Sequence, residues 1–514
     1  MTDPAPSTPV PGAIALSLVS HTNAGKTTLA RTLLGRDVGL VADAPHVTEF
    51  AEAFAMLETP QQERLMLWDT PGFGDSMRLV RRLRALDRPL ADPLGWFMGT
   101  VWDRWRDRPF WSSQQALRNV RDEADVMLYL VNAAESPEAA GYVAPEMALL
   151  GWAGKPVIVL LNQLGPPRAA AIEEAELARW RVHLAAFPPV RTVLAFDAFA
   201  RCWVQELTLL RAIEDVLDAL PRARMARLRA AWQAQRAQTF DAAMRALAES
   251  LARLAVATEP LRDADGLRAR LRGVGAAIAA GVGRGHPDDA PHAQAQKVLA
   301  QRLDAELRAN TLELVRLHGL EGQGGDVHTE ILSRLATHYE LRLAMDESKA
   351  AMWGGMVTGA LVGLKADVLS GGLTLGGGLL AGGLLGALGA AGLARCVNIV
   401  RGTDRSWIAW NGEALDQMTD AALLRYLAVA HFGRGRGDWA EGESPPHWKD
   451  VIATALAPHR AALAAAWASR GGGGGGDDDA VALVPALQTI LTQAAHSALD
   501  QLYPGSLDDP APPA

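Results

Sequence analysis

The sequence predicts an α/β domain with a doubly wound, mostly parallel sheet, followed by an all-α region. Between Ala13 and about Ala200, five short apolar runs alternate with helix-length segments. Strands that alternate with helices form parallel sheets with crossover connections. After about Cys202 strand signals nearly vanish, and Ala, Leu and Arg recur at helical spacing. The expected strands are AIALSLVS, RLMLWDT, DVMLYLVNA, KPVIVLLNQ and RTVLAFDAF.

Length and local composition predict the domain boundaries. A chain of 514 residues corresponds to about three structural units at roughly 150 residues each. We expect a disordered leader at 1–12, the α/β domain at 13–215, a helical domain at 216–503 and a disordered, proline-rich tail at 504–514. Within the helical domain, the run of glycines and aspartates at 471–479 predicts a low-complexity loop.

The composition argues against several classes of protein. The net charge of −8 gives no support to a nucleic-acid-binding surface. Cys202 and Cys396 are too few for a disulfide framework or a cysteine-based zinc site, and they fit a reducing compartment. The first twelve residues have no basic or apolar region of a signal peptide. We therefore expect a cytoplasmic protein.

A phosphate-binding loop is predicted directly after the first strand. The segment Ser20–Thr27, SHTNAGKT, fits the pattern GxxxxGK[ST] except that Ser20 replaces the first glycine. Backbone amides of such a loop surround phosphates at the start of the following helix. Lys26 would reach the β and γ phosphates, and the Thr27 hydroxyl would bind Mg²⁺. A chance match beside a strand is the alternative. The predicted nucleotide-binding residues of this loop are Asn23, Ala24, Gly25, Lys26, Thr27 and Thr28.

A second motif, Asp69-Thr-Pro-Gly72, follows the strand RLMLW and makes a chance match much less plausible. An aspartate at this place holds Mg²⁺ through water, and the Gly72 amide can meet the γ phosphate. Thr48 lies between the two motifs, where a switch loop would add a hydroxyl to Mg²⁺; alone it is equally well polar filler. The predicted magnesium ligands are Thr27, Thr48 and Asp69, and the predicted catalytic residues are Lys26, Thr48 and Gly72.

The order of these motifs resembles the Era-like branch of the translation-factor-type GTPases, whose G domain is of the 50S ribosome-binding-GTPase type. The resemblance covers roughly residues 13–215. It implies a P-loop NTPase fold that binds GTP with Mg²⁺. The glycine-rich helical second half resembles bacterial proteins that join such a GTPase to a C-terminal domain of unknown function, number 3482. That family has no established activity.

The base-reading motif departs from the GTPase pattern Asn-Lys-x-Asp. The strand VIVLL ends in Asn162-Gln163-Leu164-Gly165, so Asn162 is in place but Gly165 has no carboxylate to accept from guanine. The motif therefore leaves GTP and ATP both open. Asp197, in the later loop LAFDAF, either supplies the missing acceptor or is an ordinary capping aspartate.

The residues around the γ phosphate also depart from the pattern. Phe73 stands where Ras-type GTPases have the glutamine that positions the attacking water, so intrinsic hydrolysis should be slow. In some Era-like enzymes an asparagine at the position of Asn23 holds a potassium ion against the phosphates. Asn23 is therefore a candidate K⁺ ligand; the alternative is that it only shapes the loop.

Two segments indicate interaction surfaces. The Trp-rich insertion at about 89–112 either covers apolar surface between the two halves or forms an amphipathic interface for a membrane or partner. Residues 350–394 form a glycine-rich apolar hairpin, in which Val368–Ala394 runs 27 residues without a charge. About 20 apolar residues suffice to span a bilayer. The hairpin either attaches the protein to the cytosolic face of the inner membrane or lies buried in a soluble bundle.

The sequence thus predicts a GTP-binding switch that hydrolyses GTP slowly, with Mg²⁺ as cofactor and K⁺ as a candidate second ion. Its helical half would associate with a membrane through 350–394 or with an unidentified protein partner. The alternative is a nucleotide-binding scaffold with negligible turnover.

Overall fold

The computed structural model describes residues 12–35, 38, 51–84, 93–100, 107–165, 168, 170–198, 202–260, 290–320, 397–401, 406–432, 445–470 and 477–507. Thr48, the hairpin 350–394 and all but Gly12 of the leader lie outside these described residues. The chain divides into two compact units, which are described separately. The first comprises Met1–Gln238, Ala430–Pro445 and Leu499–Ala514, and the second comprises Thr239–Val429 and Pro446–Ala498.

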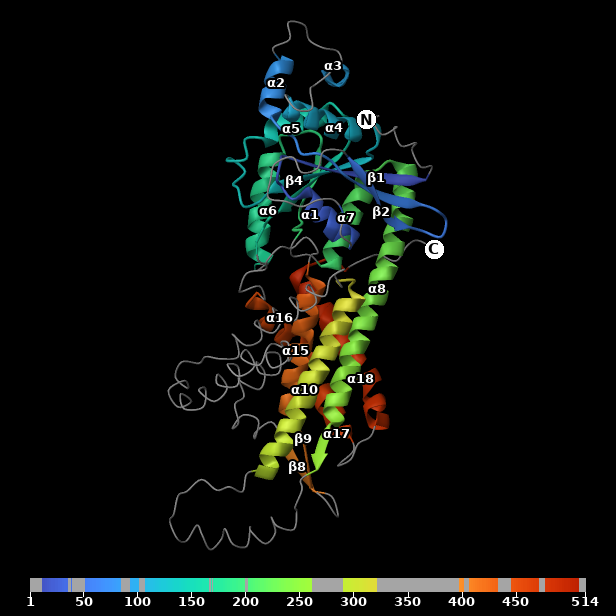
Figure 1. Cartoon of the computed structure of the whole chain (residues 1–514), viewed down its shortest axis with the longest axis vertical. Helices are drawn as coiled ribbons and strands as arrows, with labels where there is room; N and C mark the ends of the chain where they lie inside the picture. Colours follow the sequence, from blue (N-terminus) through green and yellow to red (C-terminus); the bar gives the residue numbers. More distant parts are fainter. Residues whose placement is uncertain are drawn as a thin grey trace, which may run out of the picture. The chain divides into compact units, whose positions relative to one another are not determined.

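The first unit contains a six-stranded sheet in the order β2-β3-β1-β4-β5-β6 (Figure 1). Its strands are β1 (Ala13–Ser20), β2 (Glu52–Glu58), β3 (Arg64–Asp69), β4 (Val126–Asn132), β5 (Val157–Asn162) and β6 (Val190–Ala195). All neighbours pair in parallel except β2, which pairs antiparallel with β3 at the edge. The predicted α/β class with a mostly parallel sheet is confirmed. The sequence analysis missed β2 because this edge strand is largely exposed and has an irregularity after Ala55, so its pattern does not alternate clearly.

Helices cover both faces of this sheet, because alternate residues of the central strands enter two separate cores. Met127, Tyr129 and Val131 of β4 belong to one core cluster, whereas Leu128 and Leu130 belong to the other. This period of two is what strands buried on both faces require. The described helices that lie wholly within the first unit are α1 (Lys26–Leu34), α2 (Ser76–Arg84), α3 (Pro93–Gly99), α4 (Arg108–Asp122), α5 (Val143–Gly151), α6 (Ala170–Leu184) and α7 (Trp203–Val216).

The described part of the predicted Trp-rich insertion packs onto this unit. It forms α3 and the first residues of α4, and Phe97 and Phe110 are buried in the same core cluster as Tyr129. Trp111 is half-buried against that cluster. Trp102 and Trp105 lie outside the described residues.

The second unit is largely helical, as predicted for the region after the α/β domain, and it also contains a small sheet that was not predicted. A three-stranded antiparallel sheet in the order β7-β9-β8 joins Thr258–Pro260, Val397–Arg401 and Ser406–Trp410. Strands of three to five residues are too short to show a periodicity. The helical elements from α8 onward are α8 (Ala219–Val256), α10 (Ala290–Leu317), α15 (Gly412–Ala430), α16 (His447–Leu456), η3 (Ala457–His459), α17 (Arg460–Ser469) and α18 (Asp477–Leu502).

Three predicted boundaries differ from the structure. Met225, Leu228 and Trp232 of α8 lie in a core cluster of the first unit, so that unit's core extends beyond the predicted boundary at 215. The predicted loop 471–479 is too long, because Asp477–Asp479 form the first turn of α18, where carboxylates interact favourably with the helix dipole. The predicted disordered tail begins too early, because Ser506 accepts hydrogen bonds from the first unit.

Among the described helices, one stretch, His447–Ser469, is long and apolar enough to cross a membrane by length and composition. It comprises α16, η3 and α17, and Trp448, Leu456 and Trp467 are buried within it. Buried helices of folded cores meet the same criteria, so this stretch adds no support for membrane association.

Candidate nucleotide-binding site

The predicted phosphate-binding loop connects β1 to α1 at the carboxyl edge of the sheet. Asn23 and Gly25 both have a left-handed backbone, with φ of 66° and 89°. Asparagine adopts this conformation more readily than most residues, and glycine adopts it without strain. Gly25 is also required for space, because a Cβ there would lie 2.7 Å from the Asn162 Nδ2. The loop therefore turns sharply, and α1 begins at Lys26 with its first amides facing the loop.

Ser20, which replaces the first glycine of the motif, binds the lysine of the motif. The Lys26 Nζ donates to the Ser20 Oγ at 3.0 Å, and both side chains are buried. Burial lowers the pKa of Lys26, while the negative charges of Asp69 and Glu146 act in the opposite direction. In the sequence Ser20 is only a departure from the pattern, whereas in the structure its hydroxyl accepts a hydrogen bond from the ammonium group of Lys26.

Asp69 and Thr27 form the part of the site that fits a magnesium ion. The Thr27 Oγ1 donates to the Asp69 Oδ2 at 2.6 Å. The other carboxylate oxygen, Oδ1, is buried and has no hydrogen-bond partner among the residues that the structure describes. Burial raises the pKa of Asp69, which the Thr27 hydrogen bond and the charge of Lys26 partly offset. An orphaned carboxylate oxygen beside a hydroxyl is the all-oxygen donor set that Mg²⁺ prefers.

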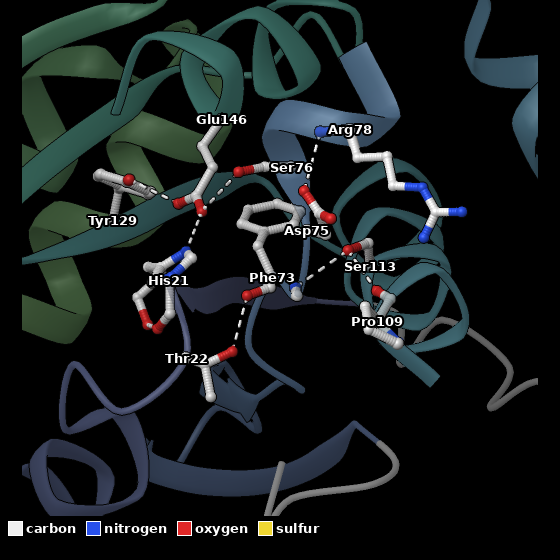
Figure 2. Close-up of polar contacts among 12 residues, drawn as sticks. His21, Thr22, Phe73, Asp75, Ser76, Arg78, Pro109, Ser113, Tyr129 and Glu146 are labelled. Atoms are coloured by element: carbon white, nitrogen blue, oxygen red, sulfur yellow. Dashed lines mark hydrogen bonds and ion pairs between the residues drawn. The ribbon is translucent and has the colours of Figure 1, made fainter. Parts of the chain in front are cut away.

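The Asp69-Thr-Pro-Gly72 motif lies directly against the phosphate-binding loop. The Phe73 amide donates to the Ser20 carbonyl at 2.9 Å. The Thr22 amide also donates to the Phe73 carbonyl. The Thr22 hydroxyl donates to the same carbonyl at 2.8 Å (Figure 2). A Cβ on Gly72 would lie 2.9 Å from the Thr22 Cα and 3.1 Å from the Lys26 Nζ, so only glycine fits. The Phe73 side chain is fully buried in the core and cannot orient a water molecule.

The base end of the site consists of backbone-bracing interactions. The Asn162 side chain is fully buried; its Nδ2 donates to the Ala24 carbonyl and its Oδ1 accepts from the Ala198 amide, both at 2.8 Å. The Asp197 Oδ2 accepts from the Leu164 amide at 2.7 Å. Asp197 thus holds the loop after β5. This contact is the kind expected of an ordinary loop or capping aspartate, the second interpretation given for this residue. Asn162 joins that region to the phosphate-binding loop.

The structure therefore brings Lys26, Thr27, Asp69 and Gly72 together at one end of the loop, and Asn23 lies within the loop with a left-handed backbone. Ala24 and Gly25 contact Asn162 instead, and Thr28 is buried on α1. Thr48, predicted as both a magnesium ligand and a catalytic residue, lies outside the described residues.

One buried cluster beside the loop was missed by the sequence analysis. Glu146 of α5 is fully buried and accepts hydrogen bonds from His21, Ser76 and Tyr129 (Figure 2). The only signal in the sequence is a single glutamate in the otherwise uncharged helix VAPEMALLG. Nothing in that spacing indicates which residues the glutamate contacts.

The fold and the two motifs define a P-loop nucleotide-binding domain. Residues 15–163 match the family model described as 50S ribosome-binding GTPase. Residues 335–472 match the model described as a domain of unknown function, DUF3482. The chain therefore joins a GTP-binding GTPase domain to a C-terminal DUF3482 domain, which confirms the predicted architecture.

Solved structures similar to this chain include two of Era and one of a probable GTP-binding protein, engB. Era with MgGDPNP and a fragment of 16S ribosomal RNA has 18% identity and a TM-score of 0.29, over 40% of this chain and 58% of that one. An Aquifex aeolicus Era variant bound to GDP and AlF4⁻ has 17% identity and a TM-score of 0.27, over 60% of this chain and 99% of that one. The engB protein has 15% identity and a TM-score of 0.23, over 39% of this chain and 97% of that one. Scores this low carry no argument about this chain. No curated protein matches it.

Proposed function

We propose that the protein is a GTP-dependent molecular switch that binds GTP with Mg²⁺ and hydrolyses it slowly. The observation that carries the proposal is the arrangement of Lys26, Thr27 and Asp69, in which a buried ammonium group lies beside a hydroxyl-bound carboxylate with one orphaned oxygen. The ammonium group would bind the β and γ phosphates, and Thr27 and Asp69 would hold the ion. A bound Mg²⁺ would neutralise charge that develops on the phosphates during transfer.

The slow rate follows from Phe73. Its side chain is buried and occupies the position of a water-orienting glutamine, so the described residues of this segment offer no group to activate water. The Gly72 amide remains as a donor toward the γ phosphate, close to Lys26. Asn23, with its left-handed backbone in the loop, is the candidate ligand for a K⁺ ion that would supply the missing charge stabilisation.

Calorimetric titration of the full chain with GTP and with ATP, with and without Mg²⁺, tests this proposal. We expect tight binding of GTP that depends on Mg²⁺, followed by slow release of phosphate measured on the same sample. Absence of GTP binding would overturn the assignment. Binding without any phosphate release would instead favour the alternative, a nucleotide-binding scaffold, for which the buried Phe73 is the specific observation.

We further propose that the protein is cytoplasmic and that its C-terminal part associates with the cytosolic face of the inner membrane, or with a protein partner. The support is the charge-free run at 368–394, since Lys365 and Asp367 would each cost about 2.5 to 3.5 kcal/mol at the bilayer centre and so favour an interface. Carbonate-washed membranes should retain the full chain and lose a variant without residues 350–394. A full-length protein that stays entirely in the soluble fraction would contradict membrane association.

A further inference from the structure

Glu146 is a buried acidic residue outside the two parts of the site described above. It belongs neither to the predicted phosphate contacts nor to the base end. It lies on α5 with a fully buried side chain, and three side chains form hydrogen bonds with its two carboxyl oxygens. The His21 Nδ1 lies 2.7 Å from its Oε1, the Ser76 Oγ donates to the same oxygen at 3.2 Å, and the Tyr129 hydroxyl donates to Oε2 at 2.6 Å. Burying a carboxylate is costly unless hydrogen bonds compensate for the lost water, so three donors indicate an organised site.

Two of these donors come from the two segments that surround the predicted γ-phosphate position. His21 follows Ser20 in the phosphate-binding loop, and Ser76 is the first residue of α2, three residues after Phe73. Figure 2 shows both side chains converging on the Glu146 carboxylate. The third donor, Tyr129, belongs to β4 and contacts neither segment through this hydrogen bond.

A second contact, from an aromatic ring, fixes the orientation of the His21 imidazole. The Tyr142 ring stacks on the imidazole, with 4.6 Å between ring centroids and 20° between their planes. Glu146 is therefore linked to the phosphate-binding loop through its contact with an imidazole whose orientation is itself fixed.

Ser76 lies at the start of α2, and other hydrogen bonds also fix this end of the helix. The Arg78 amide donates to the Asp75 Oδ1 at 2.9 Å, which caps α2. Between Phe73 and Asp75, the Gly74 amide donates to the Ser113 Oγ at 3.2 Å. The hydrogen bond at Ser76 is thus one of several contacts that hold the segment between Gly72, which lies close to Lys26, and the start of α2.

We propose that Glu146 is a positioning residue of the switch, which ties the phosphate-binding loop through His21 to the start of α2 through Ser76. These contacts hold the Gly72 amide beside Lys26. At that position the amide would donate to the γ phosphate of GTP, a group that GDP lacks. The inference rests on the proposed GTP binding. It predicts that loss of the Ser76 contact weakens triphosphate binding selectively.

Ser76→Ala tests this most directly, because the substitution is small and removes only the hydroxyl on the switch side. We expect its affinity for a β,γ-imido analogue of GTP to fall about fivefold, and its affinity for GDP to change less than about twofold. Ser76→Thr, which keeps a hydroxyl, should restore the wild-type ratio of the two affinities. Glu146→Gln should shift the ratio in the same direction as Ser76→Ala.

Tyr129→Phe is the matched control, because it removes a hydrogen bond to the same carboxylate without touching the loop or α2. Its ratio of analogue to GDP affinity should equal that of the wild type, even if its melting temperature falls. An equal loss for both nucleotides in Ser76→Ala, or the same shift of the ratio in Tyr129→Phe, would overturn the positioning role alone. A wild-type protein that binds neither nucleotide would overturn the proposed function itself.

Discussion

The two ends of the candidate site use their side chains differently. At the phosphate end, Lys26 and Asp69 are buried ionisable side chains, and one oxygen of Asp69 has no partner among the described residues. At the base end, both polar atoms of the Asn162 side chain bond to backbone groups, and Asp197 accepts from the Leu164 amide. Groups poised for a ligand are thus concentrated at one end, and groups that brace the fold at the other. Triphosphate and metal recognition should therefore respond to mutation far more than base selectivity.

The largest effect is expected for Lys26→Ala. Losing charge-assisted hydrogen bonds to two phosphates should cost about 3 to 4 kcal/mol, which is a loss of affinity of roughly 100- to 1000-fold. Calorimetry with GTP measures it. Lys155→Ala, just before β5 at the opposite edge of the sheet, is the matched control and should bind GTP like the wild type. Unchanged affinity in Lys26→Ala would mean that nucleotide does not bind at this loop.

Asp69→Asn should act through the metal. The amide keeps an acceptor for the Thr27 hydroxyl but removes the charge, so GTP affinity should fall about 30-fold in Mg²⁺ and change little in EDTA. Titrations in the two buffers give the comparison. Asp125→Asn is the control, because Asp125 accepts a hydrogen bond from the Ala15 amide at the other edge of the sheet. An equal loss of GTP affinity with and without Mg²⁺ would show that Asp69 does not act through the metal. It would then contradict the proposed difference between metal-binding and bracing residues.

Asn162→Ala should show the opposite behaviour, with the main effect on stability. It leaves the Ala24 carbonyl and the Ala198 amide buried without their partner, at a cost of about 2 kcal/mol or more in the free energy of unfolding. Urea denaturation of the nucleotide-free protein measures this. Asn132→Ala is a close control, since Asn132 pairs with Asn162 in the strand register and its side-chain oxygen accepts from the nearby Ala134 amide, which is exposed. If the free energy of unfolding were unchanged and only the GTP affinity fell, Asn162 would act in nucleotide recognition and not in bracing the fold.

The smallest expected effect concerns Asn23. If its side chain holds a K⁺ ion, turnover should be about fivefold faster in K⁺ than in Na⁺ at equal ionic strength, and Asn23→Ala should lose this difference. Phosphate release under single-turnover conditions provides the rates. Equal rates in the two salts would leave Asn23 with the role of shaping the loop through its left-handed backbone.

The sequence predicted those features that depend on local spacing. The strand before Ser20, the glycine at position 25 and the Asp-Thr-Pro-Gly turn are recognisable because backbone geometry restricts the residue types there. The short apolar runs that became β4 and β5, separated by helix-length segments, likewise predicted a mostly parallel sheet. These elements require no knowledge of distant contacts.

Features formed by distant parts of the chain could not be predicted in this way. Glu146 lies 125 residues from His21, and its role depends on a tertiary contact that no spacing indicates. β7 pairs with β9 although nearly 150 residues separate them, so three residues had to be recognised as a strand without their partner. The function of Ser20 also became visible only when Lys26 was placed beside it.

The contacts of Ser506 determine when, during synthesis, the first unit can finish folding. The Thr208 hydroxyl and the Arg211 guanidinium of α7 both donate to this residue, which belongs to the same compact unit as the first strand. Translation at about 5 to 20 residues per second separates β1 from Ser506 by roughly 25 to 100 s. The first unit therefore completes these contacts only after Ser506 has left the ribosome, and a fragment released before that point would expose this surface of α7.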